Sequence, residues 1–217
     1  MAHISTVVFD LDGTLVRYKG VEFESSWGAI ALAAGVQQES DRLLEEYLSQ
    51  RGAYADWVRR DAELLEGVSV LSITKKVLPP PYAKGVREAV ERLRPRYQMG
   101  ILSSGVDLVA DYVREELGLA FSVSNRLFIS NGRFTGGSET IVDLWSKDEV
   151  MKQIAADRGI ALSEICYIGD HLNDVPVMRI VGLPIAFNPK DTSLEEVCEH
   201  VTCRFSEIPQ IIELFSS

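Results

Sequence analysis

The sequence contains no long apolar run. Its longest apolar stretches, Gly28–Val36 and Val181–Phe187, are far shorter than the ~20 residues that span a bilayer. Residues Met1–Asp10 also lack the basic segment followed by an apolar one that marks a signal peptide. We therefore expect a cytoplasmic protein with no membrane partner.

Cysteine and positive charge are both scarce. The three cysteines are odd in number and no two are spaced as C-x-x-C, so we expect reduced thiols. The 22 basic residues are outnumbered by 32 acidic ones, which gives a net charge of −10. Because nucleic-acid binding depends on basic surface, we predict no nucleic acid partner.

The fraction of hydrophobic residues is ordinary for a globular protein. The 217 residues are 46% hydrophobic and 25% charged, which suits one globular domain with a modest insertion. After a buried strand at Ile4–Phe9, and again from residue 84 onward, short apolar segments alternate with segments of helical periodicity. This order predicts an α/β, Rossmann-like fold with a mostly parallel sheet flanked by helices. The later strands are expected at residues 98–102, 165–168, 183–187 and 200–203, with a hairpin at residues 126–135, and the later helices at residues 84–93, 107–117, 147–158, 175–181 and 208–215.

A helical block interrupts this alternation directly after the first strand. From Val21 to Val77, apolar residues recur at helical spacing, and Pro79–Pro81 then breaks the helical pattern. We therefore predict a helical cap domain at residues 17–79, inserted into a catalytic core made of residues 1–16 and 80–217.

Polar residues that could take part in binding or catalysis follow three of the predicted strands. Asp10 and Asp12 follow the first strand, Ser103-Ser104-Gly105 the second, and Gly169–Asp174 a later one, while Lys147 begins the helix before that later strand. In an open parallel sheet, ligands bind beyond the carboxyl ends of the strands. We therefore expect these groups to converge at one edge of the sheet.

Carboxylates gathered in this way would repel one another by several kcal/mol at an effective dielectric constant of roughly 20. Mg²⁺ would relieve that repulsion, since it takes oxygen ligands from carboxylates and from substrate phosphate. Lys147 would offset a further negative charge. The hydroxyl of Ser103 and the amides of Ser104 and Gly105, at a helix N-terminus, would suit an incoming phosphate.

Two of the carboxylates have the spacing that acid–base and nucleophilic chemistry needs. One carboxylate can attack phosphorus, and a second can protonate the leaving alcohol and then deprotonate water. Asp10 and Asp12 lie two residues apart at a strand end, so alternation would turn both side chains to one side.

At these residues the chain resembles the haloacid dehalogenase superfamily of phosphohydrolases. The segment Asp10-Leu11-Asp12-Gly13-Thr14-Leu15 is similar to the family's first motif, D-x-D-G-T-L. Ser103 fits the second motif, Lys147 the third, and Gly169–Asp174 the fourth, G-D-x-x-N-D. The helical block after the first motif and the segment Asn125–Gly136 resemble the phosphoserine phosphatase-like branch.

The resemblance implies a role for each matching residue. Asp10 would be the nucleophile and Asp12 the acid/base. Mg²⁺ would be held by the Asp10 side chain, the Asp12 carbonyl and Asp170, with Asp174 supporting them. The residues implied to bind phosphate or substrate are Gly13, Thr14, Ser103, Ser104, Gly105, Lys147 and Asn173.

The sequence departs from that branch in the cap. The phosphoserine enzymes use a cap glutamate for the substrate amine and a cap arginine for the substrate carboxylate. The best register here puts Lys19 and Asp61 at those positions, with Glu22, Glu24, Arg59 and Arg60 close by in sequence. We therefore expect weak hydrolysis of phosphoserine and a preference for another small phosphate ester.

Several alternatives stay open at this stage. The chain is predicted to be a Mg²⁺-dependent phosphomonoesterase that acts on a small phosphorylated metabolite through an aspartyl-phosphate intermediate. The alternatives are a phosphoserine phosphatase proper, a phosphotransferase and a catalytically silent phospho-ligand-binding protein. Placement in the site or elsewhere is open for His171, Tyr54, Trp57 and Lys190, and the oligomeric state, a homodimer included, is open too.

Overall fold

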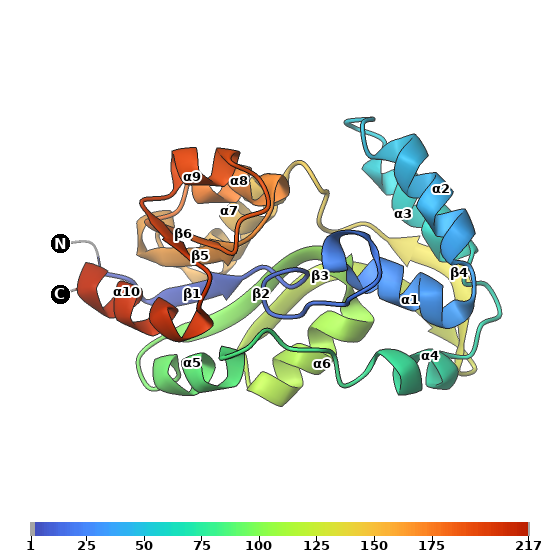
Figure 1. The fold of residues 1–217 in the computed structure, drawn as a ribbon, viewed down its shortest axis with the longest axis horizontal. Helices are drawn as coiled ribbons and strands as arrows, with labels where there is room; N and C mark the ends of the chain where they lie inside the picture. Colours follow the sequence, from blue (N-terminus) through green and yellow to red (C-terminus); the bar gives the residue numbers. More distant parts are fainter. Residues whose placement is uncertain (1–2, 217) are drawn as a thin grey trace.

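The computed structural model describes residues 3–216, which form a seven-stranded sheet with helices on both faces (Figure 1). The strand order is β4-β3-β2-β1-β5-β6-β7, and every pair is parallel except β3 with β4. The predicted Rossmann-like α/β fold is therefore confirmed. The strands are β1 (Thr6–Phe9), β2 (Gln98–Val106), β3 (Phe121–Ser130), β4 (Arg133–Glu139), β5 (Ile165–Gly169), β6 (Leu183–Phe187) and β7 (His200–Thr202).

Strand β1 lies at the centre of the sheet, and its side chains alternate between the two faces. Val7 and Phe9 belong to the core on one face, and Val8 belongs to the core on the other. All four residues of β1 are buried because helices cover both faces of the sheet. The helices after β2 are α6 (Asp107–Leu117), α7 (Lys147–Arg158), α8 (Val175–Met178), α9 (Ser193–Val197) and α10 (Ile208–Phe215), and α5 (Val86–Leu93) precedes β2.

Four of the five α-helices between β1 and β2 lie at the end of the molecule away from the two termini (Figure 1). They are α1 (Ser26–Ala34), α2 (Gln37–Tyr47), α3 (Tyr54–Glu63) and α4 (Val70–Val77). The segments that enter and leave this block run side by side. The Arg17 N–H donates to the Pro81 carbonyl at 2.9 Å, and the Ala83 N–H donates to the Leu15 carbonyl at 2.9 Å. The helical block is therefore joined to the sheet through a paired, two-stranded base.

Several elements differ from the sequence-based expectation. Strand β3 begins at Phe121 rather than at residue 126, because its first half pairs with β2 although its sequence is rich in serine. Helix α8 ends at Met178 rather than at residue 181, because the Gly182 N–H bonds to the Leu162 carbonyl at 2.9 Å and draws the chain away. Strand β2 extends to Val106 and so includes the serine pair that was expected to follow it.

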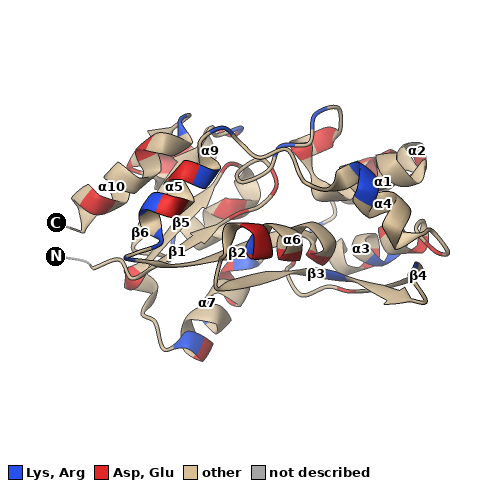
Figure 2. Cartoon of the chain, turned by 90° about the horizontal axis from the view of Figure 1, so that it is seen from below, with Lys and Arg blue, Asp and Glu red and all other residues tan. Residues whose placement is uncertain are grey.

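The surface carries charge of both signs. Figure 2 shows acidic and basic residues side by side on α5 and α7. Across residues 3–216, no helix combines the length and the apolar character needed to cross a membrane.

Candidate active site

The site lies at the carboxyl end of β1, where the chain order of the sheet reverses between β2 and β5. This is the position at which open α/β sheets bind ligands. One cavity is lined there by Asp10 and Asp12 after β1, Ser103 from β2, and Asp170 and Asn173 after β5. The predicted convergence of these side chains at one edge is therefore observed.

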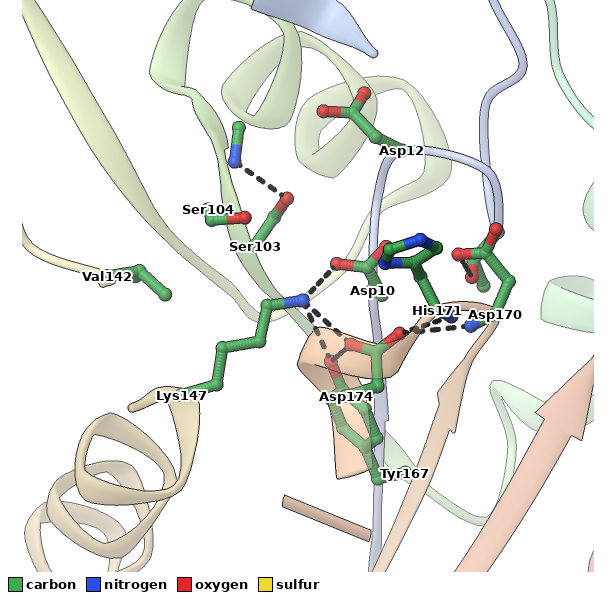
Figure 3. A network of polar contacts seen from close by, with 12 residues as sticks. Asp10, Asp12, Ser103, Ser104, Val142, Lys147, Tyr167, Asp170, His171 and Asp174 are labelled. Carbon is green, nitrogen blue, oxygen red and sulfur yellow. Dashed lines mark hydrogen bonds and ion pairs between the residues drawn. The ribbon is translucent and has the colours of Figure 1, made fainter. Parts of the chain in front are cut away.

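A buried lysine bridges two acidic residues of the site (Figure 3). The Lys147 ammonium group, from the start of α7, lies 2.7 Å from Asp10 Oδ1 and 2.7 Å from Asp174 Oδ1. The hydroxyl of Tyr167 on β5 also donates to Asp174 Oδ1 at 2.7 Å. Burial opposes the charge on Lys147, but Asp10 and Asp174 outweigh it and raise the lysine pKa. The ammonium group is therefore a fixed positive charge beside Asp10.

The carboxylate of Asp174 is fully engaged by the protein. Its Oδ1 accepts from Lys147 and Tyr167, and its Oδ2 accepts from the backbone N–H groups of Asp170 at 3.0 Å and His171 at 3.1 Å. A carboxylate with about four lone-pair sites has little capacity left after four such bonds. Asp174 thus suits a supporting role behind Asp10 and Asp170.

Three carboxyl groups of the site hold their protons unusually tightly. Burial, the repulsion from Asp174 and that from Asp170 raise the pKa of Asp10 to about 7, against the opposing effect of Lys147. Burial raises the pKa of Asp12 to about 7, and burial with repulsion from Asp174 raises that of Asp170 to about 7. The protein's own cations therefore do not balance this concentration of acidic groups.

These residues fit a bound divalent cation. One carboxylate oxygen from each of Asp10, Asp170 and Asp174 lies within 4.8 Å of the others, and all three residues are buried. Hard oxygen ligands at this spacing suit Mg²⁺, and a cation would supply the missing positive charge. Thr14, predicted to contact substrate, is fully buried and donates its hydroxyl to Asp170 Oδ1 at 3.2 Å.

Two glycines let the carboxylates approach the backbone. A Cβ atom on Gly13, whose φ is +85°, would lie 2.1 Å from Asp170 Oδ2. A Cβ on Gly105 would lie 2.6 Å from Asp12 Oδ2. Both contacts are too close for any residue with a side chain, so glycine is required for this arrangement.

The second aspartate of the first motif is held by the helical block. Ser26, the first residue of α1, donates its hydroxyl to Asp12 Oδ2 at 2.7 Å and its N–H to Asp12 Oδ1 at 2.9 Å. Asp12 thus makes its hydrogen bonds away from Asp10, whose carboxylate is turned toward Lys147 (Figure 3). The two carboxylates line one cavity but have different partners.

The Ser103–Gly105 segment also lines the cavity. The Gly105 N–H donates to Ser103 Oγ at 3.0 Å, and α6 begins only at Asp107. The Ser104 carbonyl accepts from Trp27 Nε1 at 3.1 Å, from the Tyr54 hydroxyl at 2.8 Å and from Asn125 Nδ2 at 2.8 Å. Donors from α1, α3 and β3 therefore meet on one carbonyl beside the site.

The part of the cavity beneath the helical block is mainly aromatic and aliphatic. Tyr54 and Trp57, whose placement the sequence left open, both line it, and their rings meet edge to face at 5.7 Å. Asp61 lines the same region and accepts a hydrogen bond from Ser40 Oγ at 2.9 Å. The other apolar residues here are Trp27, Leu44, Leu48, Val58, Leu144 and Trp145.

The neighbouring charged residues of the helical block take different positions. Lys19 is exposed and lies outside this cavity. Arg59 pairs with Asp56 and Glu63, and Arg60 lies 3.7 Å from Glu46, all on the exposed surface. Neither arginine contributes to the lining of the cavity.

Two further residues whose placement was open also line the cavity. His171 lines the cavity and packs against Phe23 with ring centroids 5.2 Å apart, and burial lowers its pKa. Lys190 is exposed, yet its ammonium group lies 2.8 Å from Glu24 Oε2 and 3.3 Å from Asp170 Oδ2. Lys190 is thus both a surface residue and a neighbour of the site.

Sequence reasoning missed three residues that support the site: Ser26, Asn125 and Tyr167. Ser26 and Asn125 act through contacts distant in sequence, with Asp12 and with the Ser104 carbonyl. Tyr167 lies in a strand of buried residues, where a tyrosine ring is ordinarily interpreted as part of the hydrophobic core. Only the hydroxyl of a tyrosine within an apolar strand, two residues before the Gly169-Asp170 motif, could have drawn attention to it.

Comparison with known proteins agrees with this geometry. The chain is 28% identical over 186 residues to a phosphoserine phosphatase of Methanocaldococcus jannaschii, with 85% of each chain covered. It is 30% identical to a phosphoserine phosphatase of Archaeoglobus fulgidus over 89% of its own length, but it spans only 55% of that relative. A solved structure of a phospho-aspartyl intermediate analogue of phosphoserine phosphatase superposes with a TM-score of 0.78 at 26% identity, covering 98% of this chain and 99% of that one.

A family model extends the agreement over most of the chain. The model for haloacid dehalogenase-like hydrolases matches residues 7–179, which include Asp10, Ser103, Lys147 and Asp170. The matched region begins within β1 and ends just after α8. The chain belongs to the haloacid dehalogenase-like hydrolase family.

Proposed function

We propose that this protein is a Mg²⁺-dependent phosphomonoesterase that hydrolyses a small phosphate ester through an aspartyl-phosphate intermediate. The observation that carries the proposal is the position of Asp10, buried at the centre of the site between Lys147 and the Asp170 carboxylate. The phosphoserine phosphatases to which the chain is similar support the same chemistry.

In the proposed reaction, Asp10 attacks the phosphorus atom and the bond between phosphorus and the ester oxygen breaks. Asp12 gives its proton to the leaving oxygen, so that the alcohol departs neutral. A pKa of about 7 for Asp12 suits this exchange near neutral pH, since both protonation states are populated. Asp12 then takes a proton from water as the water attacks the aspartyl phosphate, which releases phosphate and restores Asp10.

The surrounding residues would bind and orient the phosphoryl group. Lys147 offers positive charge next to Asp10, and Ser103 faces the same cavity from β2. Asp10 and Asp170, with the Asp12 carbonyl, would hold Mg²⁺, which when bound neutralises charge on the phosphoryl oxygens.

We further propose that residues 17–79 act as the cap that covers the substrate, with residues 1–16 and 80–217 as the core. The apolar cavity beneath α2 and α3 supports this division, because it would enclose the alcohol part of the ester and exclude bulk water.

Release of inorganic phosphate from 4-nitrophenyl phosphate, with and without Mg²⁺, tests the proposal directly. Hydrolysis that requires both Mg²⁺ and Asp10 is expected. Adding a small alcohol such as glycerol as an acceptor separates hydrolysis from phosphoryl transfer: inorganic phosphate should remain the main product. A protein that binds phosphate esters but releases no phosphate from any of them would contradict the assignment.

A further inference from the structure

The cap end of the cavity has a composition that differs from its catalytic end. Tyr54, Trp57 and Trp145 provide aromatic walls, and Asp61 on α3 provides a carboxylate. This region would receive the alcohol part of the substrate, so the inference drawn from it rests on the proposed function.

Asp61 is a buried acid that forms no ion pair among residues 3–216. The residue is 7% exposed, and Ser40 donates the one hydrogen bond of normal geometry that its carboxyl group accepts among residues 3–216. Burial raises its pKa to about 6, partly offset by Ser40 and by the nearby Trp57. The Trp57 indole N–H is buried and near Asp61, but it makes no hydrogen bond of normal geometry among the described residues. Asp61 is thus largely ionised at neutral pH in a place that disfavours its charge.

The described residues that line the cavity include no cation near Asp61. The basic residues on that lining are His171 and Lys190, and Lys190 lies beside Asp170 and Glu24 at the catalytic end. Arg59 and Arg60 point to surface partners. A substrate carboxylate placed here would meet Asp61 with no compensating charge, and burying an unpaired charge is costly.

We infer that the cap pocket selects a phosphate ester whose alcohol carries a positively charged ammonium group and no carboxylate. An ammonium ion would compensate Asp61, and aromatic faces attract organic cations through their negative π-systems. The cavity volume of about 130 Å³ limits the choice. Since a buried water needs about 10–15 Å³ on this scale, the space holds a small amino-alcohol phosphate.

Two matched pairs of esters test the charge requirement. Phosphocholine and 3,3-dimethylbutyl phosphate have the same shape but differ by the positive charge. We expect kcat/KM to be at least tenfold higher for phosphocholine. Phosphoethanolamine and phosphoserine differ by a carboxylate, and we expect at least a tenfold preference for phosphoethanolamine. Equal or reversed ratios for both pairs would overturn the inference.

Variants on α3 assign the preference to the pocket. Asp61→Asn keeps the size and the acceptor for Ser40 but removes the charge, so the ratio between phosphocholine and its neutral analogue should fall toward one. Trp57→Leu should lower the same ratio through loss of the aromatic face. Glu63→Gln is the matched control, since Glu63 is exposed on the same helix and pairs with Arg59. A ratio in Asp61→Asn equal to that of the wild type would show that Asp61 does not select the substrate.

Binding measurements separate this inference from the proposed activity. The dissociation constants of phosphocholine and 3,3-dimethylbutyl phosphate for the Asp10→Asn variant, measured by calorimetry with Mg²⁺, need no turnover. Tighter binding of phosphocholine by tenfold or more would support the ammonium pocket even if no ester were hydrolysed by the wild type. Hydrolysis of all the esters combined with equal affinities would leave the phosphatase assignment intact and reject the pocket.

Discussion

Ser26 binds both carboxylate oxygens of Asp12, through its hydroxyl at 2.7 Å and its backbone N–H at 2.9 Å. Ser26 begins α1, whereas Asp12 follows the central strand of the sheet. The proposed acid/base is therefore oriented by the helical block and not by the sheet alone. In the proposed reaction, placement of the substrate's alcohol and placement of its proton donor would thus depend on the same part of the chain.

Removing the Ser26 hydroxyl should impair proton donation to the leaving group. For Ser26→Ala we expect kcat/KM for an alkyl phosphate to fall by about 10- to 100-fold, within the range that general acid catalysis contributes. The value for 4-nitrophenyl phosphate should change much less, because nitrophenolate leaves without a proton. Ser72→Ala, an exposed serine of α4, is the control. Equal losses for both esters would instead indicate a general structural role for Ser26.

Asp10→Asn should abolish turnover. The amide has nearly the same shape as the carboxylate but lacks the negative charge that makes it a nucleophile. We expect kcat to fall by at least three orders of magnitude while the circular dichroism spectrum stays that of the wild type. Acid-quenched wild-type protein should carry phosphate on Asp10 when analysed by mass spectrometry. Phosphate trapped on a different residue would refute the role of Asp10.

Activity should depend on Mg²⁺ bound near Asp170. Excess chelator is expected to abolish phosphate release, and added Mg²⁺ should restore it. Ca²⁺ should restore little, because its longer and less regular ligand shell would misplace the nucleophile. Asp170→Asn should weaken the activation, seen as a higher Mg²⁺ concentration at half-maximal rate. Full activity in chelator would contradict the predicted cofactor.

Lys147 should be essential for the stability of the site. Lys147→Met leaves Asp10 and Asp174 buried without their cation, which costs on the order of 3–5 kcal/mol when one partner of a buried pair is removed. Urea unfolding in chelator measures the loss. Lys152→Met, on the exposed face of the same helix, should change the free energy of unfolding by no more than about 0.5 kcal/mol. Similar small losses in both variants would show that the acids of the site are balanced in another way.

Asp61→Asn should increase stability at neutral pH and not at acid pH. The folded protein binds the Asp61 proton more tightly than the unfolded chain does, because burial raises the pKa from 3.8 to about 6. The carboxyl group therefore lowers the free energy of unfolding as the pH rises from about 4 to about 6, and the loss persists above pH 6. At about 1.4 kcal/mol per pKa unit, the upper limit is on the order of 3 kcal/mol.

Denaturant unfolding of the wild type and of Asp61→Asn at pH 4 and pH 8 checks this sign. The variant should be more stable at pH 8, and the difference should shrink at pH 4. Glu63→Gln should show no comparable dependence on pH, since Glu63 is exposed. A variant that is less stable than the wild type at pH 8 would mean that Asp61 contributes a favourable charge interaction in the free protein.

Local sequence was sufficient to predict which residues form the catalytic end of the site. Asp10 and Asp170 each directly follow a strand whose apolar pattern is readable without a structure, and Ser103 lies in the second half of such a strand. Parallel strands place such ends at one edge, so their convergence follows from the order of the elements. The motif residues also identified the family, because their order and spacing encode the same strand ends.

Which charged residue lies at the cap end of the cavity could be determined only from the tertiary structure. Periodicity shows that Arg59, Arg60 and Asp61 face different directions on a helix, since each residue turns by about 100°. It does not show which of the three faces the cavity, because the rotation of α3 is fixed by its packing against α2 and β4. The contacts of Ser26 with Asp12 and of Tyr54 with the Ser104 carbonyl likewise join segments 14 and 50 residues apart. The sequence thus determined the chemistry at the strand ends through local pattern, whereas the folded packing of the helices decided which charged residue of α3 lines the cavity.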